Sequence, residues 1–566
     1  MAERDYSKLD KAELIKIVEK LESRKKYGLI WDEEKVKEQF EKDAENALPV
    51  LSEVKSKEIV DGNHSKPINF IIEGDNYHAL SVLNFTHQKK IDVIYIDPPY
   101  NTGDTSWKYN NDFVEKEDTY RHSKWLSFMN KRLLLARNLL TERGVLVCTI
   151  DDNEFTRLGL LLEEIFPSHQ ITCVTIVHNP AGIQGNNFSY THEYAYFVYP
   201  KAGQSIGLQD RDDDPDIRPL RNVSAGEVLR DTAANCFYPI FVRDNKIIGF
   251  GDVCPDSFHP RSANILRKDG VIEIYPIDPQ GQERKWVFAR QSVEKIVDEL
   301  TVEFNKKRKI LDVIRRKSKF PFRTVWTGSK YSANNNGTQL LNQIIKPDSF
   351  SYPKSIYAVI DCIKAASNEN KSVIVLDFFA GSGTTGHAVM EMNKEDGGNR
   401  SFILCTNNEN KIAEKVCYPR IKNVISGYKN LKNHNHVSGV GGSLKYFTTR
   451  FVKKTNNSDD FKARITNECT EMLCLREGVF SEVKKTANYR IFKHGAKTVA
   501  VYYSLERESL PVLKKELEKI NGEKTLYCFT LDPSGLSKTE FANWRGIKLE
   551  PIPQKILDVY KQIYEY

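Results

Sequence analysis

Two short apolar runs, at 91–96 and 373–376, constrain most strongly how this chain can fold. Each run is typical of a buried strand, and each leads directly into a carboxylate and a sequence that turns the chain. The first run is followed by Asp97-Pro98-Pro99-Tyr100, and the second, 280 residues later, by Asp377 and the glycine-rich segment 378–385. A glycine-rich turn from a strand into a helix is the usual place to hold a charged cofactor. The two turns together predict a catalytic site built on one sheet.

Strand and helix patterns alternate around these runs. The expected elements are, in order, strands at 68–72 and 91–96, a helix at 121–140, a strand at 144–150, a helix at 154–165 and strands at 171–177 and 194–199. The alternation resumes at about 350 and continues through a strand at 402–405. This pattern predicts an α/β fold with a mostly parallel, doubly wound sheet.

Three segments depart from this alternation. Between about 203 and 340 the periodicity weakens, which predicts an inserted module of short strands with one helix at 291–304. The tail from about 445 has its own strands and helices, so we expect a small separate domain there. Near the start, Asp10 and Glu13 form a capping-box signature that predicts an amphipathic helix at 8–26.

Length and composition exclude several classes of protein. A chain of 566 residues is too long for one core, so two to four domains are expected. The absence of a long apolar stretch and of an apolar signal core predicts a cytoplasmic protein with no membrane span. Ten scattered cysteines without a C-x-x-C pair indicate reduced thiols and no metal site. The net charge of +7 is compatible with a polyanionic partner but does not require one.

The glycine-rich segment selects among cofactors. Gly381 and Gly383 allow the backbone to approach a ligand, and Thr384 opens a helix whose free N–H groups favour an anionic group. The spacing lacks the third glycine of a dinucleotide fingerprint and the Gly-Lys-Ser/Thr of a P-loop. Nicotinamide and ATP binding are therefore disfavoured, and a tight structural turn is the alternative. Asp377 at the strand end favours a ligand with an ammonium group.

The tetrapeptide at 97–100 is suited to work on an amine. Two successive prolines fix the backbone, so the Pro98 carbonyl becomes a rigid acceptor beside the Asp97 carboxylate. Two acceptors that converge on an exocyclic amino group favour localising its lone pair, and these hydrogen bonds strengthen as positive charge develops. Tyr100 supplies a ring on which a base can stack. The alternative is a structural Asp-Pro-Pro turn.

These two motifs resemble the signatures of S-adenosylmethionine-dependent amino-methyltransferases that act on DNA. The catalytic motif precedes Phe379-Ala380-Gly381-Ser382-Gly383 with a long insertion between them, as in the beta group, where the insertion is the target-recognition domain. The segments 103–133, 150–154 and 405–410 are similar to the modification (Mod) subunits of type III restriction-modification systems. The resemblance implies a Rossmann-like methyltransferase sheet, an adenine-N6 target and S-adenosylmethionine as cofactor.

The resemblance also implies a division of the chain and its partners. We expect an N-terminal helical segment (1–60), a methyltransferase domain in two parts (61–200 and 346–444), a target-recognition insertion (201–345) and a C-terminal interaction domain (445–566). The implied partners are duplex DNA, a helicase-nuclease restriction subunit and a second copy of the chain. The alternatives are a solitary methyltransferase, a DNA-binding subunit that has lost catalysis, and a methyltransferase that acts on structured RNA.

Matching the family motifs residue by residue implies site roles. Asp97, Pro98 and Tyr100, with Pro99 between them, would bind and activate the target amine. The implied cofactor-binding residues are Asp75, Phe350, Lys354, Asp377, Phe379, Gly381, Gly383 and Thr384, with Lys354 meeting the cofactor carboxylate. The family's acidic ribose ligand is replaced by a threonine here, which leaves Thr406, Asn408 and Glu409 as alternatives.

The DNA contacts are expected outside these motifs. An adenine in a duplex is reached only by base flipping, so a pocket with a flexible wall is implied. The loop 179–187 has a suitable composition, and Tyr190 or Tyr194 is expected to face the flipped base; an ordinary surface loop is the alternative. In the insertion, the expected phosphate contacts are Lys306, Arg308, Arg315 and Arg316, unless these residues form a charged helix face.

Overall fold

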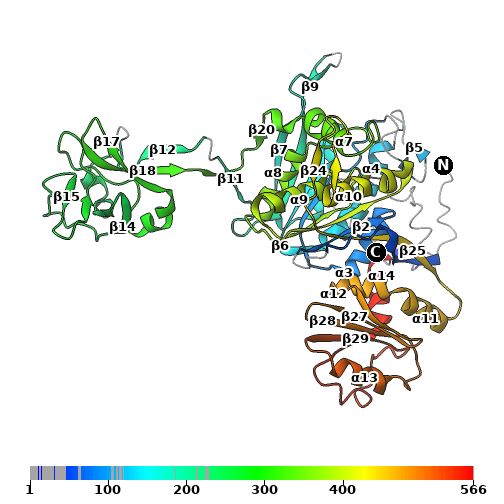
Figure 1. Ribbon diagram of the computed structural model, residues 1–566. Helices are drawn as coiled ribbons and strands as arrows, with labels where there is room; N and C mark the ends of the chain where they lie inside the picture. The colour runs from blue at the N-terminus through cyan, green and yellow to red at the C-terminus, as the bar shows by residue number, and fades with distance from the viewer. Residues whose placement is uncertain are drawn as a thin grey trace. The chain divides into compact units, whose positions relative to one another are not determined.

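The computed structural model describes residues 46–61, 66–103, 118, 120–184, 187–211, 214–223 and 228–564, together with isolated positions elsewhere (Figure 1). The amphipathic helix predicted at 8–26 lies outside these continuous ranges. The chain divides into two compact units, one comprising 1–207 and 323–566 and the other Leu208–Phe322. Each unit is described by itself below.

The first unit is built on a sheet that has ten strands within the described ranges. Their order is β1 (Ala47–Glu53), β25 (Ser443–Lys453), β2 (Ile68–Glu73), β22 (Ser401–Thr406), β21 (Ile374–Asp377), β3 (Ile91–Ile96), β6 (Leu140–Ile150), β10 (His192–Pro200), β7 (His169–Val177) and β20 (Val325–Trp326). The six strands from β25 to β6 are parallel to one another, whereas β1 and β10 pair antiparallel with their neighbours. The predicted mostly parallel, doubly wound sheet is confirmed.

The helices of this unit fall into two groups. One group comprises α3 (Asn76–Thr86), α4 (Arg121–Arg137) and α5 (Phe155–Ile165), and the other comprises α8 (Ile356–Ser367), α9 (Thr384–Asp396) and α10 (Tyr418–Ser426); helices pack against neighbours within each group. The chain proceeds from β3 through α4 to β6, but from β21 through α9 in the opposite direction to β22. Because crossover connections are right-handed, these opposite directions place α4 and α9 on opposite faces of the sheet. The carboxyl ends of β3 and β21 therefore border the crevice in which ligands of such sheets bind.

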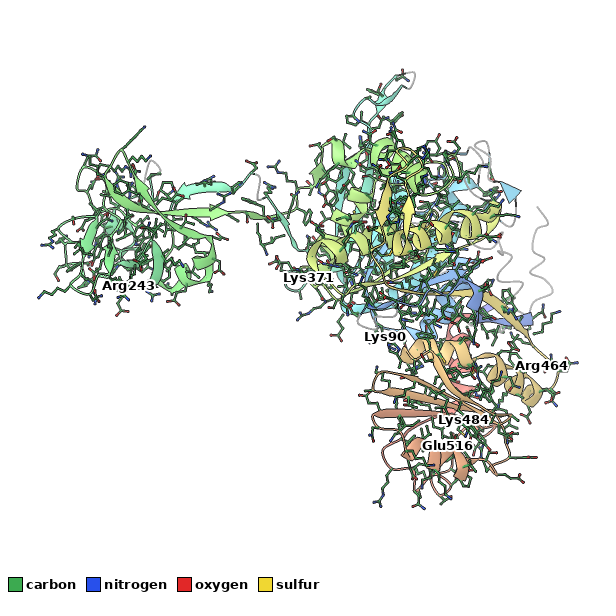
Figure 2. All side chains as sticks on the ribbon, viewed as in Figure 1. Lys90, Arg243, Lys371, Arg464, Lys484 and Glu516 are labelled. Atoms are coloured by element: carbon green, nitrogen blue, oxygen red, sulfur yellow. The ribbon has the colours of Figure 1, made fainter. Side chains whose placement is uncertain are left out.

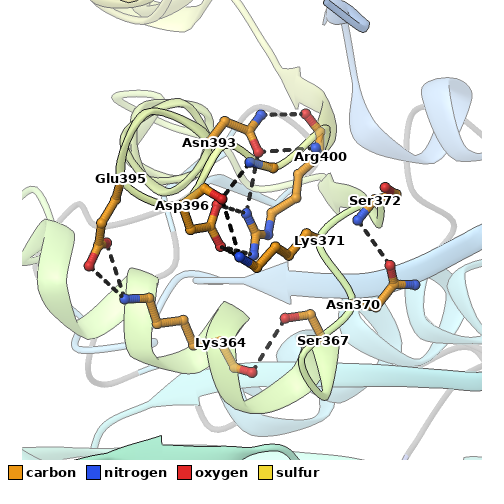
Figure 3. Close-up of polar contacts among 10 residues, drawn as sticks. Lys364, Ser367, Asn370, Lys371, Ser372, Asn393, Glu395, Asp396 and Arg400 are labelled. Atoms are coloured by element: carbon orange, nitrogen blue, oxygen red, sulfur yellow. Dashed lines mark hydrogen bonds and ion pairs between the residues drawn. The ribbon is translucent and has the colours of Figure 1, made fainter. Parts of the chain in front are cut away.

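Polar contacts fasten the end of α9 to the strand that follows it (Figure 3). The Arg400 guanidinium donates to both Asp396 carboxylate oxygens at 2.9 and 2.8 Å. Lys364 of α8 forms an exposed ion pair with Glu395 of α9 at 3.1 Å. These contacts lie at the helix ends, away from the carboxyl edge of the sheet.

The N-terminal strand corrects one boundary of the predicted domains. Residues 47–53 were expected in a helical segment, but they form β1, which pairs with β25 from Ala47↔Lys453 to Glu53↔Phe447. The side chains of 47–51 are buried. Burial against a partner some 400 residues away along the chain overrides the local preference.

The C-terminal segment forms a second sheet in the same compact unit. Its strands are β26 (Ser481–Lys485), β27 (Tyr489–His494), β28 (Lys497–Tyr502), β29 (Glu523–Phe529) and β30 (Lys548–Ile552), with helices α11 (Ser458–Glu468), α12 (Thr470–Glu477), α13 (Leu510–Glu518) and α14 (Gln554–Tyr564). An ion pair between Lys484 and Glu516 joins β26 to α13 (Figure 2). Met472, Val501 and Ile556 belong to the same hydrophobic core as Leu83 of α3. Removing this segment would therefore expose the core of the ten-stranded sheet.

The second unit, Leu208–Phe322, is an all-β module with short helical turns. It contains a four-stranded sheet of β14 (Lys246–Phe250), β13 (Ile240–Arg243), β16 (Ile272–Ile274) and β15 (Asn264–Leu266), and a three-stranded sheet of β12 (Asp216–Pro219), β18 (Ile310–Lys317) and β17 (Leu300–Asn305). A further pair joins β11 (Leu208–Asp210) to β19 (Lys319–Pro321). The core is formed by Leu220, Tyr238, Trp286 and Val313 with their neighbours.

The helix predicted at 291–304 is wrong over most of its length. Only α6 (Arg290–Val293) is α-helical, the segment Glu294–Glu299 is a 3₁₀ helix, and 300–305 is β17. The reason is pairing, because β17 forms a continuous antiparallel ladder with β18. Among the described residues, no helix combines the length and the apolar character needed to cross a bilayer.

Candidate active site

The two motifs meet at one edge of the sheet. Asp97 directly follows β3, and Asp377 is the last residue of β21. These strands are hydrogen-bonded neighbours, with Val375 opposite Val93 and Leu376 opposite Ile94. The tertiary structure thus brings the proline tetrapeptide and the glycine turn to the same crevice, as their positions after buried strands predict.

Three contacts hold the tetrapeptide in place. The Thr149 hydroxyl donates to Asp97 Oδ1 at 2.6 Å, and the Trp125 indole N–H donates to the Pro99 carbonyl at 2.7 Å. The Tyr100 hydroxyl donates to Glu193 Oε2 at 3.1 Å. The second oxygen of Asp97, Oδ2, has no hydrogen-bond partner among the described residues. The Asp97 side chain therefore presents one carboxylate oxygen to an incoming donor.

Lys354 contacts the proline tetrapeptide. Its ammonium group is 3.2 Å from Asp97 Oδ1, also contacts Glu193 and the Tyr100 hydroxyl, and sits 4.5 Å from the centre of the Tyr100 ring. Burial lowers the pKa of Lys354, but the Asp97 and Glu193 carboxylates outweigh burial and hold this pKa above its usual value. The lysine remains a cation, with its charge directed at the two carboxylates.

Asp377 stabilises the glycine turn by accepting two hydrogen bonds from it. Asp377 is 3% exposed, and its two oxygens accept hydrogen bonds from the Phe379 amide at 2.9 Å and the Thr385 hydroxyl at 2.6 Å. Burial raises the pKa of Asp377 to about 7, against the lowering by these two donors. Gly381 and Gly383 adopt left-handed φ angles of 46° and 77°. A Cβ on Gly381 would lie 3.2 Å from the Phe350 ring, so the structure brings Phe350 to this turn.

A buried arginine donates hydrogen bonds to the same turn. Arg420 of α10 is fully buried and donates to the Ser382 hydroxyl at 3.1 Å, to the Thr384 hydroxyl at 2.8 Å and to His387 at 3.3 Å. Burial lowers the pKa of Arg420 to about 10. No carboxylate pairs with Arg420 in the described part of the chain, and its Nε has no partner there. Its positive charge therefore lies uncompensated directly beneath the glycine turn.

Asp75 lies at the carboxyl end of β2, next to these elements. Its carboxylate caps α3 by accepting from the Tyr77 amide at 2.7 Å, and its side chain remains 45% exposed. The neighbouring Asn76 donates to the Phe378 carbonyl at 3.0 Å and accepts from Arg132 at 2.5 Å. Phe128, over whose ring Arg132 lies, also contacts the Phe379 ring. The β2 turn and the glycine turn therefore form one connected wall.

The three alternatives for a ribose ligand differ in availability. Thr406 is buried at the end of β22, where its carbonyl accepts from the Gly74 amide. The Asn408 side chain accepts from the Glu414 amide at 3.1 Å. Glu409 is partly exposed at the following turn.

Tyr190 and Tyr194, the two tyrosines expected near the target base, both follow β7 along the chain. Tyr190 is 53% exposed on the short hairpin of β8 (Ile183–Gln184) and β9 (Ser189–Tyr190). Tyr194 lies on β10, stacks on Phe155 and donates to Asp152 at 3.1 Å. The structure thus leaves Tyr190 exposed and engages Tyr194 in local contacts.

The basic residues of the insertion occupy a β-hairpin, so the alternative of a charged helix face is wrong. Lys306 and Arg308 lie in the turn between β17 and β18, and Arg315 and Arg316 lie on β18. Arg308 pairs with Asp312 at 3.4 Å, and Arg315 pairs with Glu299 at 2.6 Å. Lys306 and Arg316 are exposed.

Glu193, Thr149, Trp125 and Arg420 all belong to this site, and none was expected from the sequence. Only Glu193 carries a signal, because it stands as a carboxylate in an otherwise aromatic and apolar strand, His192-Glu193-Tyr194-Ala195-Tyr196-Phe197. The other three are residue types that occur in many buried positions.

Curated proteins similar to this chain are DNA modification enzymes. The chain is 29% identical over 465 residues to the Mod subunit of the type III restriction-modification enzyme EcoPI of Escherichia phage P1, covering 71% of this chain and 67% of that protein. It is 28% identical to the type II methyltransferase M.KpnI of Klebsiella pneumoniae, covering 70% of this chain and 93% of that protein. It is 30% identical to the StyLTI Mod subunit of Salmonella typhimurium, covering 63% of this chain but only 55% of that protein.

Solved structures similar to this chain include the M1.HpyAVI–SAM complex, at 13% identity over 62% of this chain and 96% of that chain with a TM-score of 0.28. Another is the PvuII DNA methyltransferase (cytosine-N4-specific), at 10% identity over 64% and 90% with a TM-score of 0.32. At these TM-scores the solved structures add nothing to the assignment. The sequence match is more extensive, because the family described as DNA methylase (N6_N4_Mtase) matches residues 91–416, more than half of the chain. That span contains both the proline tetrapeptide and the glycine turn, and the chain belongs to this family of N6/N4 DNA methylases.

Proposed function

We propose that this chain transfers a methyl group from S-adenosylmethionine to the exocyclic N6 amine of an adenine flipped out of duplex DNA. The observation that carries the proposal is Asp97 Oδ2, which has no partner among the described residues and lies in the same crevice as the glycine turn. The Pro98 carbonyl is the second acceptor that the sequence predicts. Two oriented acceptors next to an aromatic ring match an amino group on a planar base.

Asp97 and the Pro98 carbonyl would each accept one N–H of the target amine. An exocyclic amine is a poor nucleophile because its lone pair is delocalised into the ring. The two hydrogen bonds favour the geometry in which that lone pair is localised, and they strengthen as positive charge develops on nitrogen. Tyr100 stays neutral, because burial and the nearby carboxylates raise the pKa of its hydroxyl. Its ring is then a stacking surface for the base.

The residues around the glycine turn fit S-adenosylmethionine. The cofactor, when bound, supplies an electrophilic methyl group. Gly381 lets the Phe350 ring approach the turn closely, and the uncompensated charge of Arg420 next to the turn favours a carboxylate there. Asp75 and Glu409, both at carboxyl ends of strands, are the exposed or half-exposed acids suited to the adenosine part. Phe350 and Phe379 supply apolar contact next to the turn.

Adenine is proposed over cytosine because the tetrapeptide begins with aspartate and ends with tyrosine. The resemblance associates serine in first position more often with cytosine amines. Base flipping is required in either case, since the amine of a stacked base is out of reach of a crevice site.

The experiment that tests the proposal incubates the purified full chain with labelled S-adenosylmethionine and unmethylated duplex genomic DNA. Methylated nucleosides are then separated by chromatography and identified by mass spectrometry. We expect N6-methyladenine from the wild type and at least a thousandfold lower rate from Asp97→Ala. Asp460→Ala, an exposed aspartate in the first turn of α11, is the matched control and should retain the wild-type rate.

Each outcome decides between the alternatives. N4-methylcytosine would refute the adenine target, and label that enters only structured RNA would refute the DNA substrate. Binding of DNA without any methyl transfer would indicate a subunit that has lost catalysis. Equal rates for the wild type and Asp97→Ala would refute the mechanism.

A restriction subunit and a second copy are further proposed partners. The two Mod relatives support a type III-like assembly, whereas the M.KpnI match, which covers 93% of that protein, favours a solitary enzyme. Deletion of the C-terminal segment does not separate these alternatives, because that segment shares the methyltransferase core. Light scattering of the full chain, alone and mixed with the restriction subunit of a type III system, measures both associations directly. We infer a cytoplasmic location from the DNA substrate and the unpaired thiols of all ten cysteines.

A further inference from the structure

Glu193 is a buried carboxylate at the site to which the proposed function gives no role. It lies on β10, and its side chain is 7% exposed. Its Oε2 contacts both the Lys354 ammonium and the Tyr100 hydroxyl. A buried carboxylate is costly unless it is paired and hydrogen-bonded, so this position is maintained by its two partners.

We propose that Glu193 is a positioning residue that holds the Lys354 ammonium and thereby leaves the Asp97 carboxylate available for the target amine. This inference rests on the proposed function. Two carboxylates share one ammonium group, since Lys354 lies between Glu193 and Asp97. Lys354 contacts Glu193 Oε2 and Asp97 Oδ1, so only one of the two Asp97 oxygens meets the ammonium group. Without Glu193, Asp97 would be the sole counter-ion of a buried cation and a weaker acceptor for the amine.

Glu193 also orients the ring on which the base would stack. The Tyr100 hydroxyl has Glu193 as its acceptor and Lys354 as a donor to its oxygen. With both of these contacts in place, the ring cannot rotate away from the crevice without breaking two hydrogen bonds to charged groups. The contact spans 93 residues of sequence, and it forms only because the antiparallel pair β6–β10 brings Glu193 beside the end of β3.

Lys354, Glu193 and Asp97 form one cluster of charged groups. Lys354 is the one cation in this cluster among the described residues. The other titratable neighbours are Tyr95, Tyr100, Cys148, Asp151, Cys362 and Asp377. Burial raises the pKa of each tyrosine and cysteine well above its usual value, so these four stay neutral below pH 9. Asp151 and Asp377 are present in every variant compared below, so their titration is common to all of them.

The test is a charge cycle measured by the single-turnover rate of methyl transfer between pH 5 and 9. Lys354→Met leaves two carboxylates without a cation, so one of them takes up a proton at higher pH. We expect the acid limb of this profile to move up by at least one pH unit. Glu193→Gln should lower the plateau rate at least tenfold without that upward shift. The double variant K354M/E193Q should return the acid limb to within about 0.3 unit of the wild type.

The exposed pair Lys364–Glu395 of α8 and α9 supplies matched controls, K364M and E395Q, which should leave rate and pH profile unchanged (Figure 3). Glu193→Asp retains the charge and should keep the wild-type acid limb. Melting temperatures establish that each variant is folded, and the rescue by E193D and by the double variant stands even where K354M alone unfolds.

The inference is overturned if E193Q transfers methyl groups at the wild-type rate, or if the double variant keeps the shifted acid limb of K354M. A purely structural role for Glu193 would lower the rate of E193Q but would leave the shifted acid limb of K354M unchanged in the double variant. Failure of the proposed function looks different, because then the wild-type protein itself transfers no methyl group to DNA.

Discussion

Replacing Asp377 by asparagine should stabilise the protein, and the gain should depend on pH in a defined way. Burial raises the pKa of Asp377 from 3.8 to about 7. The folded state thus holds a proton more tightly than the unfolded state, so the contribution of this group is fully present below pH 4 and is lost as the pH rises through 7. Asparagine keeps the neutral form at every pH, and the Thr385 hydroxyl and Phe379 amide retain a partner. The stability of D377N relative to the wild type should therefore increase by about 1.4 kcal/mol per pH unit between pH 4 and 7, about 4 kcal/mol in total, and stay constant above.

Urea unfolding of D377N and the wild type at pH 5, 6, 7 and 8 measures this difference. Asp396→Asn is the control of opposite sign, because hydrogen bonds from Arg400 hold the pKa of Asp396 below its usual value. That carboxylate titrates below pH 4, so D396N should be destabilised by an amount that does not change between pH 5 and 8. A stability difference between D377N and the wild type that is flat from pH 5 to pH 8 would refute the reasoning.

The remaining predictions concern ligand binding. Gly381→Ala adds a methyl group 3.2 Å from the Phe350 ring at a left-handed φ, so calorimetry should show about tenfold weaker cofactor binding. Gly397 is also left-handed but has open space around it, so Gly397→Ala should bind the cofactor normally. Arg420→Met removes the donors beneath the glycine turn and should lower the stability by about 3 kcal/mol and weaken cofactor binding at least tenfold; unchanged binding would show that its charge is not sensed there. Lys306→Ala and Arg316→Ala should each reduce the slope of log affinity for DNA against log salt by about 1, and an unchanged slope for both would exclude them as phosphate contacts.

The sequence by itself determined the fold class and the position of the site. The alternation of apolar runs with amphipathic helices is a local pattern, and it specifies strands and helices without knowledge of their partners. The prolines after β3 and the glycines after β21 restrict the backbone at their own positions, so their effect can be read one residue at a time. Parallel strands share a carboxyl edge, which is why both motifs meet in one crevice.

Local patterns gave wrong structure where a strand depends on pairing with a partner strand, whether distant or adjacent in a hairpin. Residues 47–53 form a strand because β25 lies beside them, and 300–305 form a strand because β18 does. The C-terminal segment has its own sheet, yet its helices complete the core of the first. Intrinsic preference is worth tenths of a kcal/mol per residue, so burial and ladder formation override it.

Only the tertiary structure decided which charges face one another. Lys354 and Glu193 are 161 residues apart, and neither position has a local signal that names its partner. Their pairing places Lys354 against Asp97 and Tyr100, where the sequence had suggested a cofactor carboxylate as its partner. Electrostatic partnership depends on distance and burial, and both are fixed by how β10 and the start of α8 pack against the end of β3. The sequence predicted the chemistry of the site, and the packing of distant segments determined its charge balance.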